Sequence, residues 1–242
     1  MSEFRQDIIS QFNRAFIVEN RWRYMVRGLG NTLLITFFAL LLGVVLGVVV
    51  ATIRSSWDKV SSGMSPGPVK LLFRGVNLLC KLYLTVIRGT PVVVQILIIF
   101  FIIMATSSNK TLCAVIAFGI NSGAYVAEII RGGIMSIDSG QSEAGRSLGF
   151  NFVQTMWFIV LPQAFKNILP SLANEFIVLL KETAIAGFVG VTDLTRGANI
   201  IRGVTFQPLF PLISVALVYL VMVMFFTWLV GKLERRLRSS DH

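Results

Sequence analysis

Amide and ionisable side chains stand inside apolar stretches of this sequence, where a helix surrounded by lipid would carry none. Asn174 and Lys181 are seven residues apart, so they share one face of a helix. Glu175 and Glu182 lie on the adjacent face. A cation and carboxylates at this spacing can bind the two charged ends of a zwitterion such as an amino acid. An internal Lys181–Glu182 network that only holds helices together would satisfy the same burial constraint.

A neighbouring apolar stretch offers further polar groups for the same purpose. We expect all of these side chains to line either the interior of a helix bundle or an interface between subunits. The candidate pathway residues are Gln95, Asn121, Ser122, Tyr125, Asn174, Glu175, Lys181, Glu182 and Thr183. The stretch from Lys181 to Thr183 could instead lie nearer the outer mouth, as part of a gate. Glu128 precedes Arg131 by one helical turn, which favours an ion pair over ligand binding.

The composition places these residues in a membrane protein. Of the 242 residues, 55% are hydrophobic and only 14% are charged, which is too little charge to cover a soluble domain. The net charge of +10 would suggest nucleic acid as a partner for a soluble protein. Here the basic residues lie mostly between apolar stretches, where they anchor cytoplasmic loops and meet anionic headgroups. We therefore expect lipid contacts and no nucleic-acid partner.

The apolar stretches predict an all-α membrane protein with five transmembrane helices, each near the roughly 20 residues that a spanning helix needs. The expected spans are about 31–53, 82–105, 111–130, 168–190 and 209–231. Gly43 and Gly47, four apart, provide a small face for close helix packing. Pro91 is expected to kink the second span or to mark its start. The distribution of Lys and Arg favours a cytoplasmic C-terminus only weakly.

The chain divides into three regions. These are an N-terminal amphipathic segment (1–27), a transmembrane domain (28–231) and a basic cytoplasmic tail (232–242). Large apolar residues recur every four positions from Phe4 to Phe16, which is typical of a helix lying on a membrane face. A partly ordered tail is the alternative.

A polar, glycine-punctuated segment, EAGRSLGFNFVQTMWFIVLP, lies in the loop 136–166 between the third and fourth spans. Asp138 could cap a helix, with Gln141 three residues later returning the bond. Gly149 can end that helix in a left-handed turn.

A second helix start follows at once. Asn151 and Gln154 repeat the capping signal, and Pro162 is expected to end this second helix. Its apolar stripe consists of Phe152, Met156 and Val160, with Trp157 beside it. A helix pair with so much apolar surface outside the membrane needs a partner.

The order of residues in this segment resembles the EAA motif of the membrane subunits of bacterial ABC importers, E-A-A-x3-G-x9-I-x-L-P. The matching residues are Glu143, Ala144, Gly149, Ile159, Leu161 and Pro162, and Gly145 stands at the position of the second alanine. Gly145 departs from the pattern, since alanine is usual there. Glycine keeps the position small but lowers helix stability by about 1 kcal/mol relative to alanine.

Other stretches, covering roughly residues 28–231, are similar to the branch of that family that transports polar amino acids (the His, Glu, Gln, Arg and Lys type). They are NTLLIT (31–36), RGTPVVVQ (88–95), YVAEIIRGGI (125–134), GQSEAGRSLG (140–149), LPSLANEFIVLLKET (169–183) and GVTDL (190–194).

The resemblance implies the fold of a type I ABC importer permease, with the N-terminus outside, the C-terminus in the cytoplasm and the loop 136–166 docked on a separate ATPase. The residues that it implies for ATPase coupling are Glu143, Ala144, Gly145, Arg146 and Gly149. Glu143 would pair with a base of the ATPase, and Ala144 and Gly145 would permit close approach. Gly149 would set the angle between the two short helices.

The function so implied is that of a permease subunit of an ATP-driven importer in the bacterial cytoplasmic (inner) membrane, with a polar or basic amino acid as substrate. The expected partners are two copies of an ABC ATPase, a second permease subunit of the same or another kind, and an extracytoplasmic substrate-binding protein. This chain is expected to bind no cofactor itself, and ATP with Mg²⁺ would bind the partner ATPase.

Two other classes of protein remain to be distinguished. An ion-coupled secondary amino acid carrier would need no docking loop of this kind. An intramembrane enzyme would need a catalytic pair, and a Ser–Lys pair using Lys181 is the only candidate. The sequence has no GxxxxGK[ST] phosphate-binding motif, its one histidine is His242, and no metal-ligand spacing stands out. We therefore expect a transport subunit with no catalytic or metal site.

Overall fold

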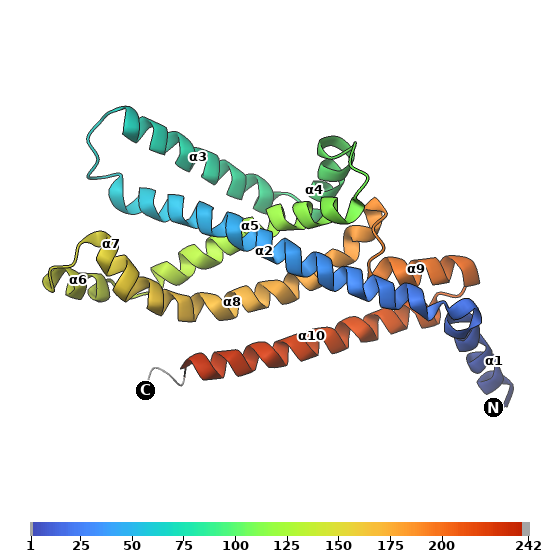
Figure 1. The fold of residues 1–242 in the computed structure, drawn as a ribbon. Coiled ribbons are helices and arrows are strands. Elements are labelled where there is room, and N and C mark those ends of the chain that lie inside the picture. Colours follow the sequence, from blue (N-terminus) through green and yellow to red (C-terminus); the bar gives the residue numbers. More distant parts are fainter. Residues whose placement is uncertain (1, 239–242) are drawn as a thin grey trace. The chain divides into compact units, whose positions relative to one another are not determined.

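The computed structural model describes residues 2–238, and it describes the side chains of residues 6–237. Within this range every regular element is a helix, which confirms the all-α prediction (Figure 1). The chain forms two compact units, each assembled from separate stretches of sequence.

The first unit contains the described residues up to Ala39 together with Val93–Phe118 and Ile177–Trp228. Its elements are α1 (Ser2–Phe12), the π-helical η1 (Asn13–Ile17), η2 (Val18–Asn20), the start of α2 (Trp22–Val60), α4 (Val92–Ile98), the π-helical η3 (Ile99–Ile103), the start of α5 (Lys110–Met135), the end of α8 (Leu161–Glu182), the 3-10 helix η5 (Thr183–Val189), α9 (Leu194–Thr205) and most of α10 (Leu209–Arg238).

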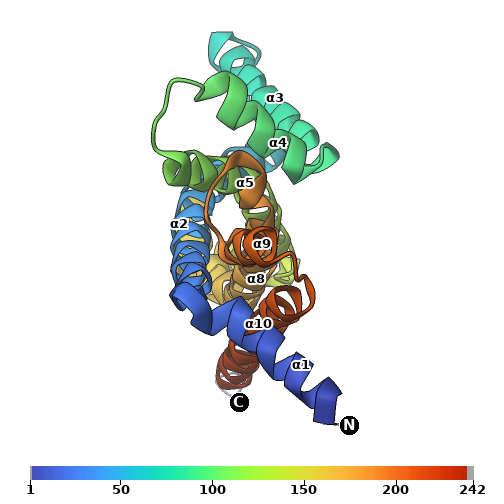
Figure 2. The ribbon, with the colours of Figure 1, turned by 90° about the vertical axis from the view of Figure 1, so that its right-hand side faces the viewer.

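The core of the first unit lies around α9. Leu194, Ala198 and Ile201 of α9 are fully buried against Met25 of α2 and Val215 of α10. Figure 2 shows α9 beside the start of α10. The segment predicted to be amphipathic is helical in α1, and the Phe12 ring packs edge-on against Phe210 at 5.8 Å between centroids. Phe4 lies outside the described side chains.

The second unit contains Leu40–Val92, Gly119–Phe176 and the described residues from Leu229 onward. It includes the rest of α2 and α5, α3 (Pro68–Gly89), α6 (Ser139–Ser147), α7 (Phe152–Thr155), the π-helical η4 (Met156–Val160), most of α8 and the end of α10.

Close packing of α2 on α5 organises this second unit. A Cβ atom at Gly47 would lie 2.5 Å from Cγ1 of Val126, and one at Gly43 would lie 3.1 Å from Cβ of Ser122. The predicted small face on α2 is therefore confirmed. Tyr83 of α3 donates a hydrogen bond of 2.6 Å to the carbonyl oxygen of Ile120, which ties α3 to α5.

The lengths and hydropathies of the helices only partly match the predicted spans. Among the described residues, α2, α5 and α10 are each long and apolar enough to cross a membrane, and α3 with α4–η3 qualifies as one broken span. The helix α8, which carries four ionisable residues, does not qualify by composition. The count of five spans and their orientation therefore stay predictions.

The second predicted span, 82–105, is not one continuous helix. The helix α3 ends at Gly89, and α4 begins at Val92, directly after Pro91. Proline has no N–H to donate and its ring displaces the carbonyl four residues earlier, so a helix readily restarts after it. Pro91 therefore marks a helix start, as one of its two predicted roles requires.

The prediction that Pro162 ends a helix is wrong, because α8 runs through it. The π turn of η4 comes directly before it, and the N–H of Leu161 bonds to the carbonyl of Met156, five residues back. This wider turn already departs from the regular hydrogen-bond ladder, so a proline at the second position of α8 costs few further backbone hydrogen bonds.

Candidate functional site

The loop between α5 and α8 folds into a short helical hairpin, made of α6, α7 and η4. Asp138 caps α6, because its Oδ1 accepts a hydrogen bond of 2.6 Å from the N–H of Gly140. At the other end Gly149 has a φ of +82°. The N–H of Phe150 bonds to the carbonyl of Gly145, and that of Gly149 bonds to the carbonyl of Arg146. This is a Schellman C-cap, so the predicted left-handed turn at Gly149 is confirmed.

The two predicted capping boxes have different outcomes. Asn151 and Gln154 exchange side-chain to backbone hydrogen bonds, both of 2.9 Å, so the box that starts α7 is confirmed. Gln141 does not complete a box with Asp138. Its Oε1 accepts instead from Nε2 of Gln163 at 3.2 Å, which links α6 to α8.

Gly145 faces the hairpin's own second arm and is buried. A Cβ atom at this position would lie 2.9 Å from Cγ2 and Oγ1 of Thr155 and from Cδ1 of Ile159. The small size of Gly145 therefore permits close approach between α6 and the α7–η4 arm. The expectation that Gly145 also permits close approach of a partner stays a prediction.

The outer side of the hairpin is apolar and exposed. Leu148 is 74% exposed, Val153 is 70% exposed and Trp157 is 66% exposed. We call this the hairpin apolar surface, and its members are Leu148, Val153, Trp157 and Phe158. Glu143, Ala144 and Arg146 are exposed on α6.

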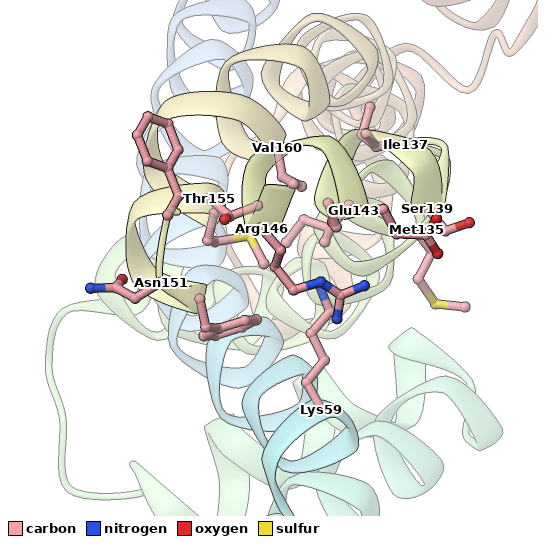
Figure 3. A pocket seen from close by; sticks show the side chains of 14 residues that line it. Lys59, Met135, Ile137, Ser139, Glu143, Arg146, Asn151, Thr155 and Val160 are labelled. Carbon is pink, nitrogen blue, oxygen red and sulfur yellow. The ribbon is translucent and has the colours of Figure 1, made fainter. Parts of the chain in front are cut away.

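A cavity of about 650 Å³ lies on the other side of the hairpin, between α6, α7 and the ends of α2 and α5 (Figure 3). Its polar lining includes Lys59, Glu143 and Arg146. The ammonium group of Lys59 lies 5.5 Å from the centre of the Phe152 ring. Figure 3 shows the Lys59 and Arg146 side chains pointing toward one another. Glu143 thus lines a cavity of its own chain as well as being exposed.

The structure brings together only some of the candidate pathway residues. Ser122 donates a hydrogen bond of 2.8 Å to Oε1 of Glu175, and both side chains are buried. Asn121 is buried one position earlier on α5. The ring of Tyr125, one helical turn further on, has the Arg88 guanidinium 5.8 Å from its centre.

The remaining candidates differ in burial. Gln95 and Thr183 are buried in the first unit, where Thr183 donates to the carbonyl of Leu180 at 2.7 Å. Asn174 and Lys181 are exposed on this chain, which agrees with a subunit interface rather than a bundle interior. Among the described residues Lys181 and Glu182 form no ion pair with each other, and the choice between a Lys181–Glu182 network and a pathway lining stays open.

Ion pairs around Glu128 link three helices of the second unit. Glu128 lies 3.7 Å from Arg131, which confirms the predicted pair, and 3.6 Å from Arg88 of α3. Arg131 also lies 3.9 Å from Asp58 of α2. Sequence reasoning missed Arg88 and Asp58, because only helical spacing was available as a signal and these partners come from other helices.

Comparison with known proteins identifies the chain's relatives. Residues 63–239 match the family described as "Binding-protein-dependent transport system inner membrane component". The chain is 37% identical to the arginine transport system permease protein ArtQ of Bacillus subtilis over 221 residues, covering 90% of this chain and 94% of that protein. It is 38% identical over 167 residues to the glutamine transport system permease protein GlnP of Escherichia coli, covering 67% of this chain and 76% of that protein.

Solved structures agree with the sequence relatives. A chain from the crystal structure of an amino acid ABC transporter with histidines has a TM-score of 0.80 and 40% identity, covering 91% of this chain and 98% of that chain. A chain of the inward-facing methionine transporter MetNI has a TM-score of 0.72 and 18% identity, covering 89% of this chain and 97% of that chain, which shows the fold alone. The chain therefore belongs to the binding-protein-dependent transport system inner membrane components, the permease subunits of type I ABC importers.

Proposed function

We propose that this permease subunit carries a polar or basic amino acid across the membrane and couples that transport to a separate ATPase through the hairpin. The single observation that supports this best is the hairpin itself, a capped helix pair with a large exposed apolar surface in a chain of this family. The names of the similar proteins, which specify arginine, glutamine and histidines, support the class of substrate.

The build of the hairpin suits the transmission of a motion. Its first helix is capped at both ends, its second arm starts with a capping box, and η4 runs directly into α8. A helix pair fixed in this way moves as a body and can displace α8, whereas a floppy loop could not. The hairpin apolar surface would enter a cleft of the ATPase, with Ala144 permitting close approach and the exposed Glu143 and Arg146 meeting charges of the partner.

The remaining parts of the complex follow from this role. Two ATPase subunits would bind ATP with Mg²⁺ and close, and a second permease subunit would complete the pathway. A substrate-binding protein would deliver the amino acid from outside, on the side of the N-terminus. The exposed positions of Asn174 and Lys181 support a pathway that lies at the interface with the second permease subunit.

The buried Ser122–Glu175 pair is the polar centre of the proposed pathway in the second unit. A carboxylate inside a membrane needs a partner, and the Ser122 hydroxyl is one. A cationic group of a substrate, such as an ammonium or guanidinium, would be a stronger one. This supports polar and basic amino acids over acidic ones.

The test is the ATPase activity of the assembled complex. We would purify this chain with its ATPase and compare hydrolysis with and without the amino acid-loaded binding protein. The loaded binding protein should stimulate the wild type. Gly149→Pro should abolish the stimulation, because proline fixes φ near −65° and Gly149 has a φ of +82°. Glu143→Arg should abolish it by reversing a docking charge.

Matched variants separate docking from misfolding. Gly149→Asn should keep most of the stimulation, since asparagine tolerates the left-handed conformation. Glu143→Gln should keep part of it. Transport that persists without ATP and follows an ion gradient would contradict the proposal and favour a secondary carrier.

A further inference from the structure

A second cavity, of about 500 Å³, lies among α2, α3 and α5 of the second unit and is rich in cations. Its lining residues are Arg54, Lys81, Leu84, Thr85, Arg88, Gly89 and Glu128. Lys81, Leu84, Thr85 and Arg88 fall on one face of α3, so a single helix supplies most of this wall. None of its lining residues belongs to the hairpin or to the candidate pathway residues, although the Arg88 guanidinium lies 5.8 Å from the centre of the Tyr125 ring.

The charges of this cavity do not balance. Three cationic side chains, Arg54, Lys81 and Arg88, face one carboxylate, that of Glu128. That carboxylate is already shared between Arg88 and Arg131. Among the described residues neither Arg54 nor Lys81 forms an ion pair. The cavity therefore suits a ligand with net negative charge better than a zwitterion.

Arg54 has an unfulfilled donor as well as an unpaired charge. Its Nε is buried and has no hydrogen-bond partner among the described residues. A buried N–H without a partner is costly, and an anion in the cavity would remove that cost. Two arginines and a lysine around one cavity are a set of donors that suits a phosphoryl group, because guanidinium groups bind its oxygens bidentately.

The surroundings of the cavity indicate where such a phosphoryl group comes from. Leu78, Leu82 and Val86 of α3 follow one another at helical spacing beside the cationic face, and they are 64%, 58% and 48% exposed. In a membrane protein this apolar row is suited to acyl chains. Basic pockets between membrane helices are known as binding sites for anionic lipid headgroups.

We propose that this cavity binds the phosphoryl headgroup of an anionic phospholipid, with Arg54, Lys81 and Arg88 holding the phosphate and the exposed row of α3 contacting an acyl chain. The inference needs only that the chain lies in a membrane, so it does not rest on the proposed substrate or on the coupling role of the hairpin.

The test measures lipid retention by the complex of this chain with its ATPase. The complex would be stripped of lipid in detergent and incubated with a mixture of phosphatidylglycerol and phosphatidylcholine. Native mass spectrometry would then count the lipids that stay bound. The wild type should retain phosphatidylglycerol selectively. The double variant Arg54→Gln, Lys81→Gln should bind phosphatidylglycerol at least about tenfold more weakly, since each basic residue near a headgroup contributes to the free energy of lipid binding.

Control variants keep the experiment decisive. The control variant Lys70→Gln, Arg74→Gln also removes two positive charges, but both lie on α3 outside the cavity. It should retain phosphatidylglycerol as the wild type does. If the double variant fails to assemble, Lys81→Gln alone serves in its place, because Lys81 is exposed and carries no ion pair. Equal retention by wild type and cavity variants, or no preference for phosphatidylglycerol in the wild type, would overturn the proposal.

Competition experiments separate the sources of the anion. Millimolar inorganic phosphate should displace little phosphatidylglycerol if the acyl contacts contribute. Complete displacement by phosphate would overturn the lipid assignment and leave a site for a free phosphate. Displacement by arginine or glutamine at the same concentration would overturn the site altogether and make it part of the amino acid pathway.

Discussion

Gly145 shows how the absence of a side chain sets the distance between two helices. The family pattern suggests alanine at this position, and from this pattern the sequence predicts a small residue that faces a partner. In the structure Gly145 faces the second arm of the hairpin. A Cβ atom at Gly145 would lie 2.9 Å from side-chain atoms of Thr155 and Ile159. Sequence reasoning identified the residue and its size requirement, but it had no means to decide which surface the residue faces.

We expect Gly145→Ala to destabilise the hairpin despite the higher helix propensity of alanine. Propensity favours alanine by about 1 kcal/mol, while overpacking of a close contact costs about 1–3 kcal/mol. The double variant Gly145→Ala, Thr155→Ala should recover part of the loss, because it removes the contacts with Cγ2 and Oγ1 of Thr155 and leaves that with Ile159. It also removes the Thr155 hydroxyl, which is buried and has no hydrogen-bond partner among the described residues. Thermal unfolding of the purified complex measures the stability of both variants. A higher Tm for Gly145→Ala alone than for the wild type would contradict this packing argument.

At the scale of elements, caps decide where the helices outside the predicted spans begin. Asp193 starts α9, and its carboxylate accepts hydrogen bonds of 2.9 Å from the N–H of Thr195 and 3.2 Å from that of Arg196. A Cβ atom at Gly28 would lie 2.5 Å from the carbonyl oxygen of Asp193, so α2 packs directly on this cap. The sequence contains the aspartate, but the packing that buries it comes from residues more than a hundred positions away.

Burial raises the pKa of the Asp193 carboxyl above its ordinary value of 3.8, despite the opposing backbone hydrogen bonds. The folded state therefore holds this proton more tightly than the unfolded state. Stability contributed by the protonated form is complete below the ordinary pKa and is lost as the pH rises through the raised one. We expect the Tm of the wild type, relative to that of Asp193→Asn, to fall as the pH rises from about 4 to about 7. A constant difference across that range would show that the carboxyl keeps its ordinary pKa.

At the scale of the whole molecule, the number of membrane crossings decides the sidedness of the permease. Length and composition of the described helices support three spans, or four with the broken pair, whereas α8 is long enough but too polar by itself. A polar helix can cross a membrane when its polar face is covered by protein or lines a pathway. Five spans with α8 among them would place the two ends of the chain on opposite sides.

Cysteine labelling in sealed vesicles tests this arrangement. The native Cys80 and Cys113 are buried and would be replaced by alanine. We expect Asp7→Cys to react with a membrane-impermeant maleimide added outside, and Glu234→Cys and Leu148→Cys to react only after permeabilisation. Reaction of Asp7→Cys and Glu234→Cys from the same side would indicate an even number of spans and contradict the predicted orientation.

The sequence by itself determined the all-helical class, the membrane setting, the glycine turn at Gly149 and the capping box at Asn151. These features depend on composition or on neighbours within one helical turn, so consecutive residues are enough to predict them. The tertiary structure alone decided that Gly145 faces inward, that Pro162 lies within α8, that Ser122 meets Glu175, and that Arg54, Lys81 and Arg88 line one cavity. Each of these depends on which helices pack together, and residues distant in the chain carry no local signal of that contact.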